Sequence, residues 1–141
     1  MLKKLMQRLG RYRIIMDRQD NEPYLERYYL FLKDRQRFPF NVFIHKFLKS
    51  DPDDLHDHPW GYFTFILRGG YWEHTPTGKF WRGAGHFRVC NALSLHRIEL
   101  EPGVTAWTLF IPFAQKRAWG FIQNGEWIDS DQYLAERAKT L

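Results

Sequence analysis

Two histidines in the segment Leu55-His56-Asp57-His58-Pro59-Trp60 are separated by a single residue. In an extended strand, side chains two residues apart point to the same face, so His56 and His58 can converge on one point. Two converging imidazoles can bind one metal ion. The spacing therefore predicts part of a metal site. Asp57 points to the opposite face, and we expect it to anchor the loop.

A third histidine, His96, lies in the alternating segment 91–100 and shares one face with Ser94 and Ile98. A lone histidine on a strand is more often a core or edge residue than a ligand. Beside a His-x-His pair it becomes a candidate ligand, because three ligands with open positions make a metal site that can also bind substrate. Glu73 has two interpretations, an additional carboxylate ligand or a solvent-facing ion pair.

The elements around these histidines have strand and turn patterns. The apolar run 62–67 after the pair is long enough for one buried strand. Gly69-Gly70 predicts a two-residue hairpin turn, with a return strand that begins at Tyr71. The segment Phe40–Leu48 before the pair alternates, with His45 and Phe47 on one face.

These two segments resemble the two sequence motifs of the cupin superfamily. The chain has the His-x-His pair of the first motif and its glycine at Gly69-Gly70, but Tyr62 or Phe63 stands where that motif has a glutamate. Gly85 and His96 match the spacing of the second motif. The resemblance implies a β-barrel whose metal site contains three histidines and no carboxylate.

Within the superfamily, LHDHPW and SLHRIEL are most similar to thiol dioxygenases of the cysteine dioxygenase type, which bind Fe(II) with three histidines. That resemblance covers about residues 27–122 and implies a dioxygenase. Arg27 is then the candidate for binding a substrate carboxylate. His45 should face the barrel interior as a catalytic group or fourth ligand, or as a hydrogen-bonded histidine in an apolar wall. Phe63 replaces the cysteine that those enzymes cross-link to tyrosine, so the resemblance does not extend to cysteine as substrate.

The composition limits the class of protein. A length of 141 residues indicates one domain, and 18% aromatic residues supply a packed core or an aromatic-lined cavity. The single Cys90 excludes an intrachain disulfide and a cysteine-based zinc site. No apolar run is long enough for a transmembrane helix, and residues 1–10 lack the apolar core of a signal peptide. These features predict a cytoplasmic protein with no membrane partner. The net charge is +5, and the basic residues are spread along the chain except at the N-terminus. This distribution does not favour a nucleic-acid partner.

Many short strands with turns every eight to twelve residues predict one all-β domain, a jelly-roll (double-stranded β-helix) cupin barrel with a helix at each end. We expect an N-terminal arm at 1–26, the barrel at about 27–128 and a C-terminal helix at 129–141 that Asp129 caps. The arm begins with a basic amphipathic helix, which either packs on the barrel or binds a membrane surface or partner. Asn124-Gly125 predicts a type I′ hairpin, and Pro112 is expected to end the strand that begins at Val104.

Three neutral imidazoles leave a divalent metal its full charge and several open positions. Fe(II) in such a site serves O₂ chemistry, whereas Zn(II), Ni(II) or Mn(II) would act as a Lewis acid. The prediction is an Fe(II)-dependent dioxygenase-like protein that acts on a small molecule, with a homodimer implied by the resemblance. The alternatives are a non-redox, isomerase-type cupin and a non-catalytic cupin that binds a small molecule. Side chains expected to shield the site from water are Phe63, Phe65, Trp107 and Leu109.

Overall fold

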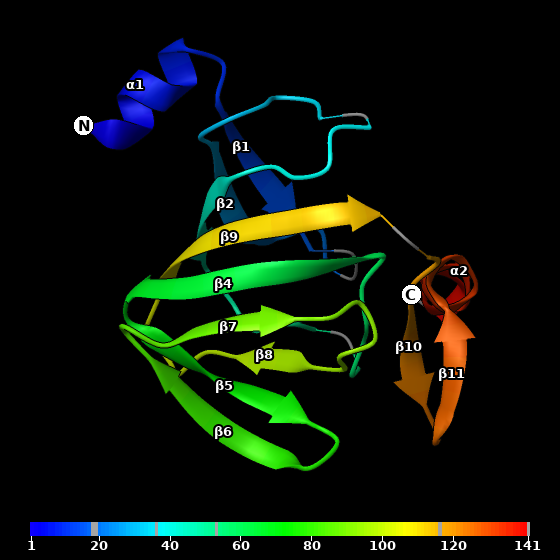
Figure 1. The fold of residues 1–141 in the computed structure, drawn as a ribbon. Helices are drawn as coiled ribbons and strands as arrows, with labels where there is room; N and C mark the ends of the chain where they lie inside the picture. Colours follow the sequence, from blue (N-terminus) through cyan, green and yellow to red (C-terminus); the bar gives the residue numbers. More distant parts are fainter. Residues whose placement is uncertain (18–19, 36, 53, 116, 141) are drawn as a thin grey trace.

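The computed structural model describes residues 1–17, 20–35, 37–52, 54–115 and 117–140, and Figure 1 shows how they are arranged. The strands of the first sheet lie in the order β1 (Tyr12–Met16), β2 (Pro23–Tyr29), β3 (Phe43–Phe47), β9 (Ala106–Gln115), β4 (Trp60–Arg68) and β7 (Phe87–Cys90). A second sheet has the order β6 (Gly78–Gly83), β5 (Gly70–Thr75) and β8 (Arg97–Glu99), and a separate hairpin pairs β10 (Gly120–Gln123) with β11 (Glu126–Asp129). Helix α1 (Leu2–Arg8) precedes these strands, and helix α2 (Ser130–Thr140) follows them.

The two sheets face each other across one apolar core. Both sheets supply buried side chains to it: Leu25, Phe47, Ile66 and Ala106 from the first sheet, and Tyr71, Ile98 and the adjacent Leu100 from the second. In β3 the side chains of Phe43, His45 and Phe47 are buried and those between them are half-buried. The inward orientation that the resemblance implies for His45 and Phe47 is therefore confirmed.

The segment that carries the His-x-His pair lies along the edge of the second sheet. The backbone N–H of Asp51 donates to the carbonyl of Ile98 (2.8 Å), and His56 and His96 exchange two backbone hydrogen bonds (3.0 Å each). On its other side His56 forms a β-bridge with Phe121 of β10. The segment thus joins β8 to the β10–β11 hairpin, so the histidines lie between strands that are distant in sequence.

The C-terminal elements agree with the sequence patterns. Asn124 and Gly125 turn the chain between β10 and β11 with φ angles of 53° and 81°, which confirms the predicted hairpin. A carboxylate oxygen of Asp129 accepts from the backbone N–H of Asp131 (2.9 Å), as a helix cap does. Tyr133 of α2 stacks on Phe121 at 3.9 Å, which docks the helix against β10. Residue 141, the last of the predicted helix, lies outside the described residues.

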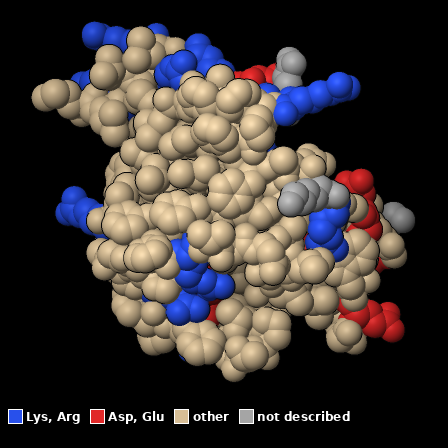
Figure 2. Space-filling view, viewed as in Figure 1, with Lys and Arg blue, Asp and Glu red and all other residues tan. Residues whose placement is uncertain are grey.

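The N-terminal residues join the first sheet. β1, which falls within the predicted arm 1–26, pairs antiparallel with β2. Helix α1 buries Met6, and its Lys3 forms an ion pair with Glu26 of β2 at 2.8 Å. Figure 2 shows Lys and Arg side chains at the end of the molecule that bears α1, whereas much of the remaining visible face carries neither charge. Neither described helix is both long and apolar enough to cross a membrane.

The predicted hairpin at Gly69-Gly70 is wrong. β4 pairs with β7 and β9, whereas β5 pairs with β6 and β8, so the chain passes from one sheet to the other at this point. Gly69 has a φ of 76°, and a Cβ added there would lie 2.3 Å from the carbonyl oxygen of Thr105. The glycine is therefore needed for a sharp corner against a neighbouring segment. A glycine pair suits both a hairpin and a corner, and the sequence pattern does not distinguish them.

The predicted strand end at Pro112 is also wrong, because β9 continues to Gln115. Pro112 lies opposite Tyr62, next to a register shift between Trp60 and Tyr62. Its carbonyl oxygen accepts from the backbone N–H of Asn41 (3.2 Å). A proline lacks an N–H to donate, and strands tolerate it at such an irregularity.

Candidate metal centre

The structure brings His56, His58 and His96 together. One ring nitrogen from each lies within 4.8 Å of the other two. The ring centroids are 5.2 Å apart for His56 and His58, 5.0 Å for His56 and His96, and 4.9 Å for His58 and His96. Three imidazoles from two distant segments thus converge as the ligands of one metal ion must.

Backbone hydrogen bonds position the rings. His56 lies in the bridge with His96, and the backbone N–H of His58 donates to the carbonyl of Ala92 (3.1 Å). The carboxylate of Asp57 faces away from the rings and accepts from the backbone N–H of Gly120 (2.7 Å) and the indole N–H of Trp127 (3.0 Å). The prediction that Asp57 anchors this loop is confirmed.

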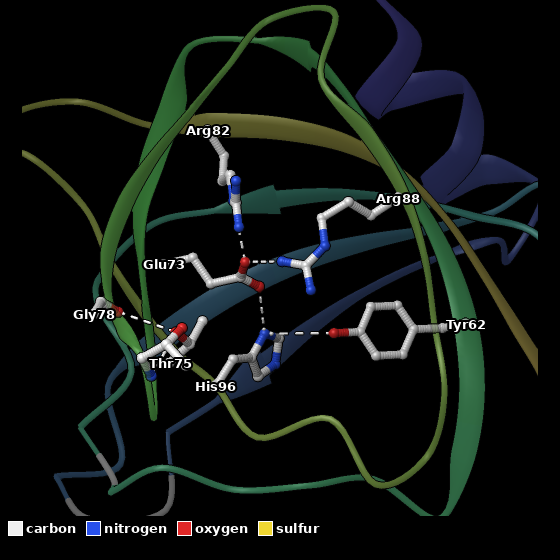
Figure 3. A network of polar contacts seen from close by, with 8 residues as sticks. Tyr62, Glu73, Thr75, Gly78, Arg82, Arg88 and His96 are labelled. Atoms are coloured by element: carbon white, nitrogen blue, oxygen red, sulfur yellow. Dashed lines mark hydrogen bonds and ion pairs between the residues drawn. The ribbon is translucent and has the colours of Figure 1, made fainter.

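Behind His96 lies a buried carboxylate. An oxygen of Glu73 is 2.9 Å from Nδ1 of His96, and the other oxygen accepts from Arg82 Nε (3.1 Å) and from Arg88, as Figure 3 shows. Burial alone would raise the pKa of Glu73, but the hydrogen bond with His96 and the charge of Arg88 outweigh it and bring the pKa to about 2. An ionised carboxylate accepts from a protonated Nδ1, which leaves the lone pair of His96 Nε2 available to a metal ion.

This placement matches neither sequence interpretation of Glu73. The side chain is 4% exposed, so it is not a solvent-facing pair. The group of converging donor atoms contains the three histidines and does not include the Glu73 carboxylate. The sequence did not identify Arg82 or Arg88 as its partners, because β6 and β7 carry them and no local pattern links those strands to Glu73.

Tyr62, one of the two residues that stand near the missing motif glutamate, lies beside the histidines. Its ring contacts His58 with centroids 4.9 Å apart, and its hydroxyl oxygen is 3.4 Å from Nδ1 of His96. Burial raises the pKa of Tyr62 well above its ordinary value, so the phenol stays protonated at neutral pH. Tyr62 therefore packs behind the histidines as a neutral group.

The predicted apolar wall lies on the wrong face. Tyr62, Thr64 and Ile66 are the buried residues of β4, so Phe63 and Phe65 project from the opposite side of the strand. The same alternation in β9 buries Thr108 and places Trp107 and Leu109 away from the interior. Both faces of these strands are apolar, so hydrophobicity alone could not set the phase.

A cleft of about 350 Å³ opens in front of the histidines. His56 and His58 line it, whereas His96 lines a cavity of about 30 Å³ behind the rings. Further lining residues are aromatic, aliphatic or acidic: Tyr24, Trp60, Trp119, Phe121, Ile15, Met16, Asp17 and Asp51. A metal ion between the rings would face a molecule bound in this cleft.

Arg27 and His45 form a pair away from that cleft. Arg27 Nε donates to His45 Nε2 (2.9 Å), and the guanidinium lies over the ring of Phe43 (4.4 Å). Burial lowers the pKa of His45 well below its ordinary value, and the charge of Arg27 adds to this effect. His45 stacks on Phe110 (5.1 Å), and Phe110 in turn contacts Tyr62 (5.2 Å). One aromatic layer therefore separates the pair from the rings around His58.

The donors suit a divalent metal. Burial lowers the pKa of His58 well below its ordinary value, and the neighbouring His96 and His56 lower it further. The ring is then neutral at physiological pH, the form that binds metal. Its Nδ1 is buried and has no hydrogen-bond partner among the described residues. Imidazole ligands suit iron, zinc, nickel and copper, and three of them leave positions open for substrate.

No family model matches the sequence, and no curated protein matches it. Solved structures do match. The polyketide cyclase RemF from Streptomyces resistomycificus is 16% identical, with a TM-score of 0.61 over 79% of this chain and 78% of that one. A sugar phosphate isomerase of the cupin superfamily from Silicibacter pomeroyi is 13% identical, with a TM-score of 0.58 over 78% and 75%. Fe(II) HppE is 16% identical, with a TM-score of 0.57 over 74% of this chain and 57% of its own.

At these identities the similarity shows the fold and not the activity. The matches support the cupin fold and do not support the narrower resemblance to cysteine dioxygenase. Their agreement with the two facing sheets confirms the fold class that the motifs predicted. The chain therefore has the fold of a cupin β-barrel, with one helix at each end.

Proposed function

We propose that this chain is a mononuclear metal-binding cupin, and that His56, His58 and His96 bind Fe(II) for a dioxygenase-like reaction on a small molecule. The observation that carries the proposal is the convergence of three imidazole nitrogens, within 4.8 Å of one another, beside an open cleft. Since this group contains no carboxylate from the described residues, the proposed ligand set is neutral.

Iron(II) bound there would supply the ability to activate O₂, which organic side chains lack. The residues of the chain would orient the histidine ligands and shield the bound molecule. Glu73 orients the ring of His96 through Nδ1, and Asp57 anchors the loop that carries the other two histidines. Trp60 and Phe121 line the cleft beside the rings and would shield a bound molecule there from water.

Arg27 and His45 remain proposed catalytic residues. Their mutual hydrogen bond and the stacking of His45 on Phe110 support an indirect role, in which the pair positions the wall behind Tyr62. The cytoplasmic location, the homodimer and the use of O₂ likewise remain predictions.

A non-redox reaction is the second candidate. Three neutral histidines with open positions also form catalytic zinc sites, in which the metal acts as a Lewis acid. The ligand geometry favours neither metal. A cupin that binds a small molecule without catalysis is the third candidate.

The test is the metal content of tag-free protein, measured by elemental mass spectrometry. We expect about one metal per chain in the wild type and its loss in His96→Ala. His74→Ala is the matched control, because His74 pairs with Glu99 on the same sheet and lies outside the converging group. Circular dichroism checks that each variant folds.

The identity of the metal separates the candidates. Iron that is lost in His96→Ala supports the first candidate and leads to O₂-uptake assays with a panel of small molecules. Zinc or nickel that is lost in the same variant keeps the site and favours the non-redox reaction. No metal in the wild type after reconstitution with Fe(II) would contradict the proposal.

A further inference from the structure

We infer that the cleft in front of the three histidines accepts an uncharged, flat ring molecule with O–H or N–H donors, and rejects molecules that carry a carboxylate or phosphate. The inference names a substrate class for the proposed metal site, and in that sense it rests on the proposed function. Three features of the cleft support this inference: its charges, its ring walls and its size.

The charges of the cleft are negative. Asp17 and Asp51 line it, and both are buried. The fold fixes these carboxylates. Asp17 forms an ion pair with Lys49, and Asp51 accepts from the hydroxyl of Tyr24 and from the backbone N–H of Ile98 (2.8 Å). A bound anion would therefore lie close to two carboxylates that cannot move away.

One of these carboxylates, Asp17, is paired with a cation, Lys49, which is not among the described residues that line the cleft. No lysine or arginine is among the residues described as lining the cleft. Lys49 is already paired with Asp17 and with Glu22 (3.0 Å). Arg27, the candidate from sequence for a substrate carboxylate, donates to His45 and does not line the cleft. Apart from a metal at the histidines, a ligand anion would thus find no cation among the described residues that line the cleft, and its desolvation would be uncompensated there.

The walls of the cleft are rings. Trp60 stacks on His58 (5.1 Å, 22° between planes), and Trp119 packs against Phe121 (5.2 Å). Tyr24 lies on β2 near the carboxylates. Flat apolar rings gain contact area and stacking energy against such walls. A hydroxyl or amine on the ring would find carboxylate oxygens as acceptors.

The cleft is compact. At about 30 Å³ of liquid per water, 350 Å³ corresponds to roughly a dozen water molecules. That space suits a bicyclic ring system better than a long chain or an oligosaccharide. Specificity would then come from the acceptors at one end and the metal at the other.

The test uses a matched pair of probes, 2-naphthol and 2-naphthoate, which share a ring system and differ in charge. Binding to metal-free and to Zn(II)-loaded protein is measured by titration calorimetry at neutral pH. We expect 2-naphthol to bind the metal-free protein at least about tenfold more tightly than 2-naphthoate. Equal or tighter binding of 2-naphthoate, or no binding of either probe, would overturn the inference.

A charge-introducing variant makes the test specific to the cleft. Met16 is exposed and lines the cleft from β1, so Met16→Lys should raise the affinity for 2-naphthoate several-fold and change that for 2-naphthol little. Ile14→Lys adds the same charge two residues away on the same strand, at an exposed side chain that does not line the cleft. It should leave both affinities unchanged. An equal effect of the two variants would show that the preference does not arise in the cleft.

The metal-free measurements separate this inference from the proposed function. If the wild type binds 2-naphthol but no metal, the ring-binding cleft stands and the metal proposal fails. If it binds metal but prefers 2-naphthoate without metal, the proposal of a metal centre stands and the substrate class inferred here is wrong.

Discussion

His96 and His58 point toward the same site but are positioned in different ways. Nδ1 of His96 is hydrogen-bonded to Glu73, a buried carboxylate that two arginines also contact. Nδ1 of His58 has no partner among the described residues, and the ring stacks on Trp60 at 5.1 Å. A polar network thus orients one proposed ligand, and packing orients the other.

The difference follows from what lies beyond each ring. His96 faces the barrel interior, where an ionised group is stable only with partners. There Glu73, His96 and the two arginines are hydrogen-bonded to one another. His58 lines the cleft, where a ligand or water can reach it. We therefore expect substitutions behind His96 to affect both folding and metal affinity, and substitutions beside His58 to affect mainly metal affinity.

The largest effect is expected from Glu73→Ala, which leaves Arg82, Arg88 and His96 without their shared acceptor. Breaking a buried ion pair from one side should lower the free energy of unfolding by about 3 kcal/mol, measured by urea denaturation of metal-free protein. Glu101→Ala is the control, because Glu101 is exposed and its carboxylate accepts a hydrogen bond from the indole N–H of Trp72 (2.6 Å). If Glu101→Ala lowered the free energy of unfolding as much as Glu73→Ala, the burial of Glu73 would not be the source of its effect on stability.

The same network predicts a pH dependence. The pKa of Glu73 falls from 4.5 to about 2 on folding, so the unfolded chain takes up this proton first as the pH is lowered. The ionised carboxylate therefore stabilises the fold fully above its unfolded pKa, by about 3 kcal/mol, and loses this contribution as the pH approaches its folded value. The stability gap between wild type and Glu73→Gln should narrow between about pH 6 and about pH 2.5. A gap that does not change with pH would contradict the assigned pKa.

Two substitutions compare the two side chains that contact Nδ1 of His96. Glu73→Gln keeps the size of the side chain but removes its charge, and loss of such an outer partner lowers metal affinity by about ten- to a hundredfold. Tyr62→Phe removes a hydroxyl at 3.4 Å from the same Nδ1, a weak contact, and should change affinity by less than about threefold. Competition with a chromogenic chelator measures both affinities. A larger effect from Tyr62→Phe would make the phenol, and not the carboxylate, the group that orients His96.

The sequence predicted the convergence of the histidines better than their surroundings. His56, His58 and Asp57 lie within one short extended segment, where local spacing determines which face each side chain occupies. Glu73, Arg82 and Arg88 come from three strands, so their contact depends on how the sheets pair, which local patterns do not contain.

Errors in the fold arose where one pattern suits two structures. Gly69-Gly70 fits a hairpin or a corner between sheets, and the second occurs because β4 and β5 belong to different sheets. Phe63 and Phe65 alternate with Tyr62 and Thr64 on a strand whose two faces are both apolar, so either face could have pointed inward. Asn124-Gly125 was predicted correctly because its turn chemistry is local.

The smallest effect is expected on the side of His58. Trp60→Leu removes the ring that stacks on His58 and leaves the backbone bond from His58 to Ala92 intact. Loss of the contact with His58 is worth about 0.5–1.5 kcal/mol, so metal affinity should fall by about two- to tenfold. The ring also contacts Tyr62 and Phe110, and the free energy of unfolding in urea should fall by less than in Glu73→Ala. Trp81→Leu, an exposed tryptophan on β6, should change neither quantity. If Trp60→Leu weakened metal binding as much as Glu73→Gln, packing and charge would orient the two histidines equally well, and the contrast between the two sides of the site would disappear.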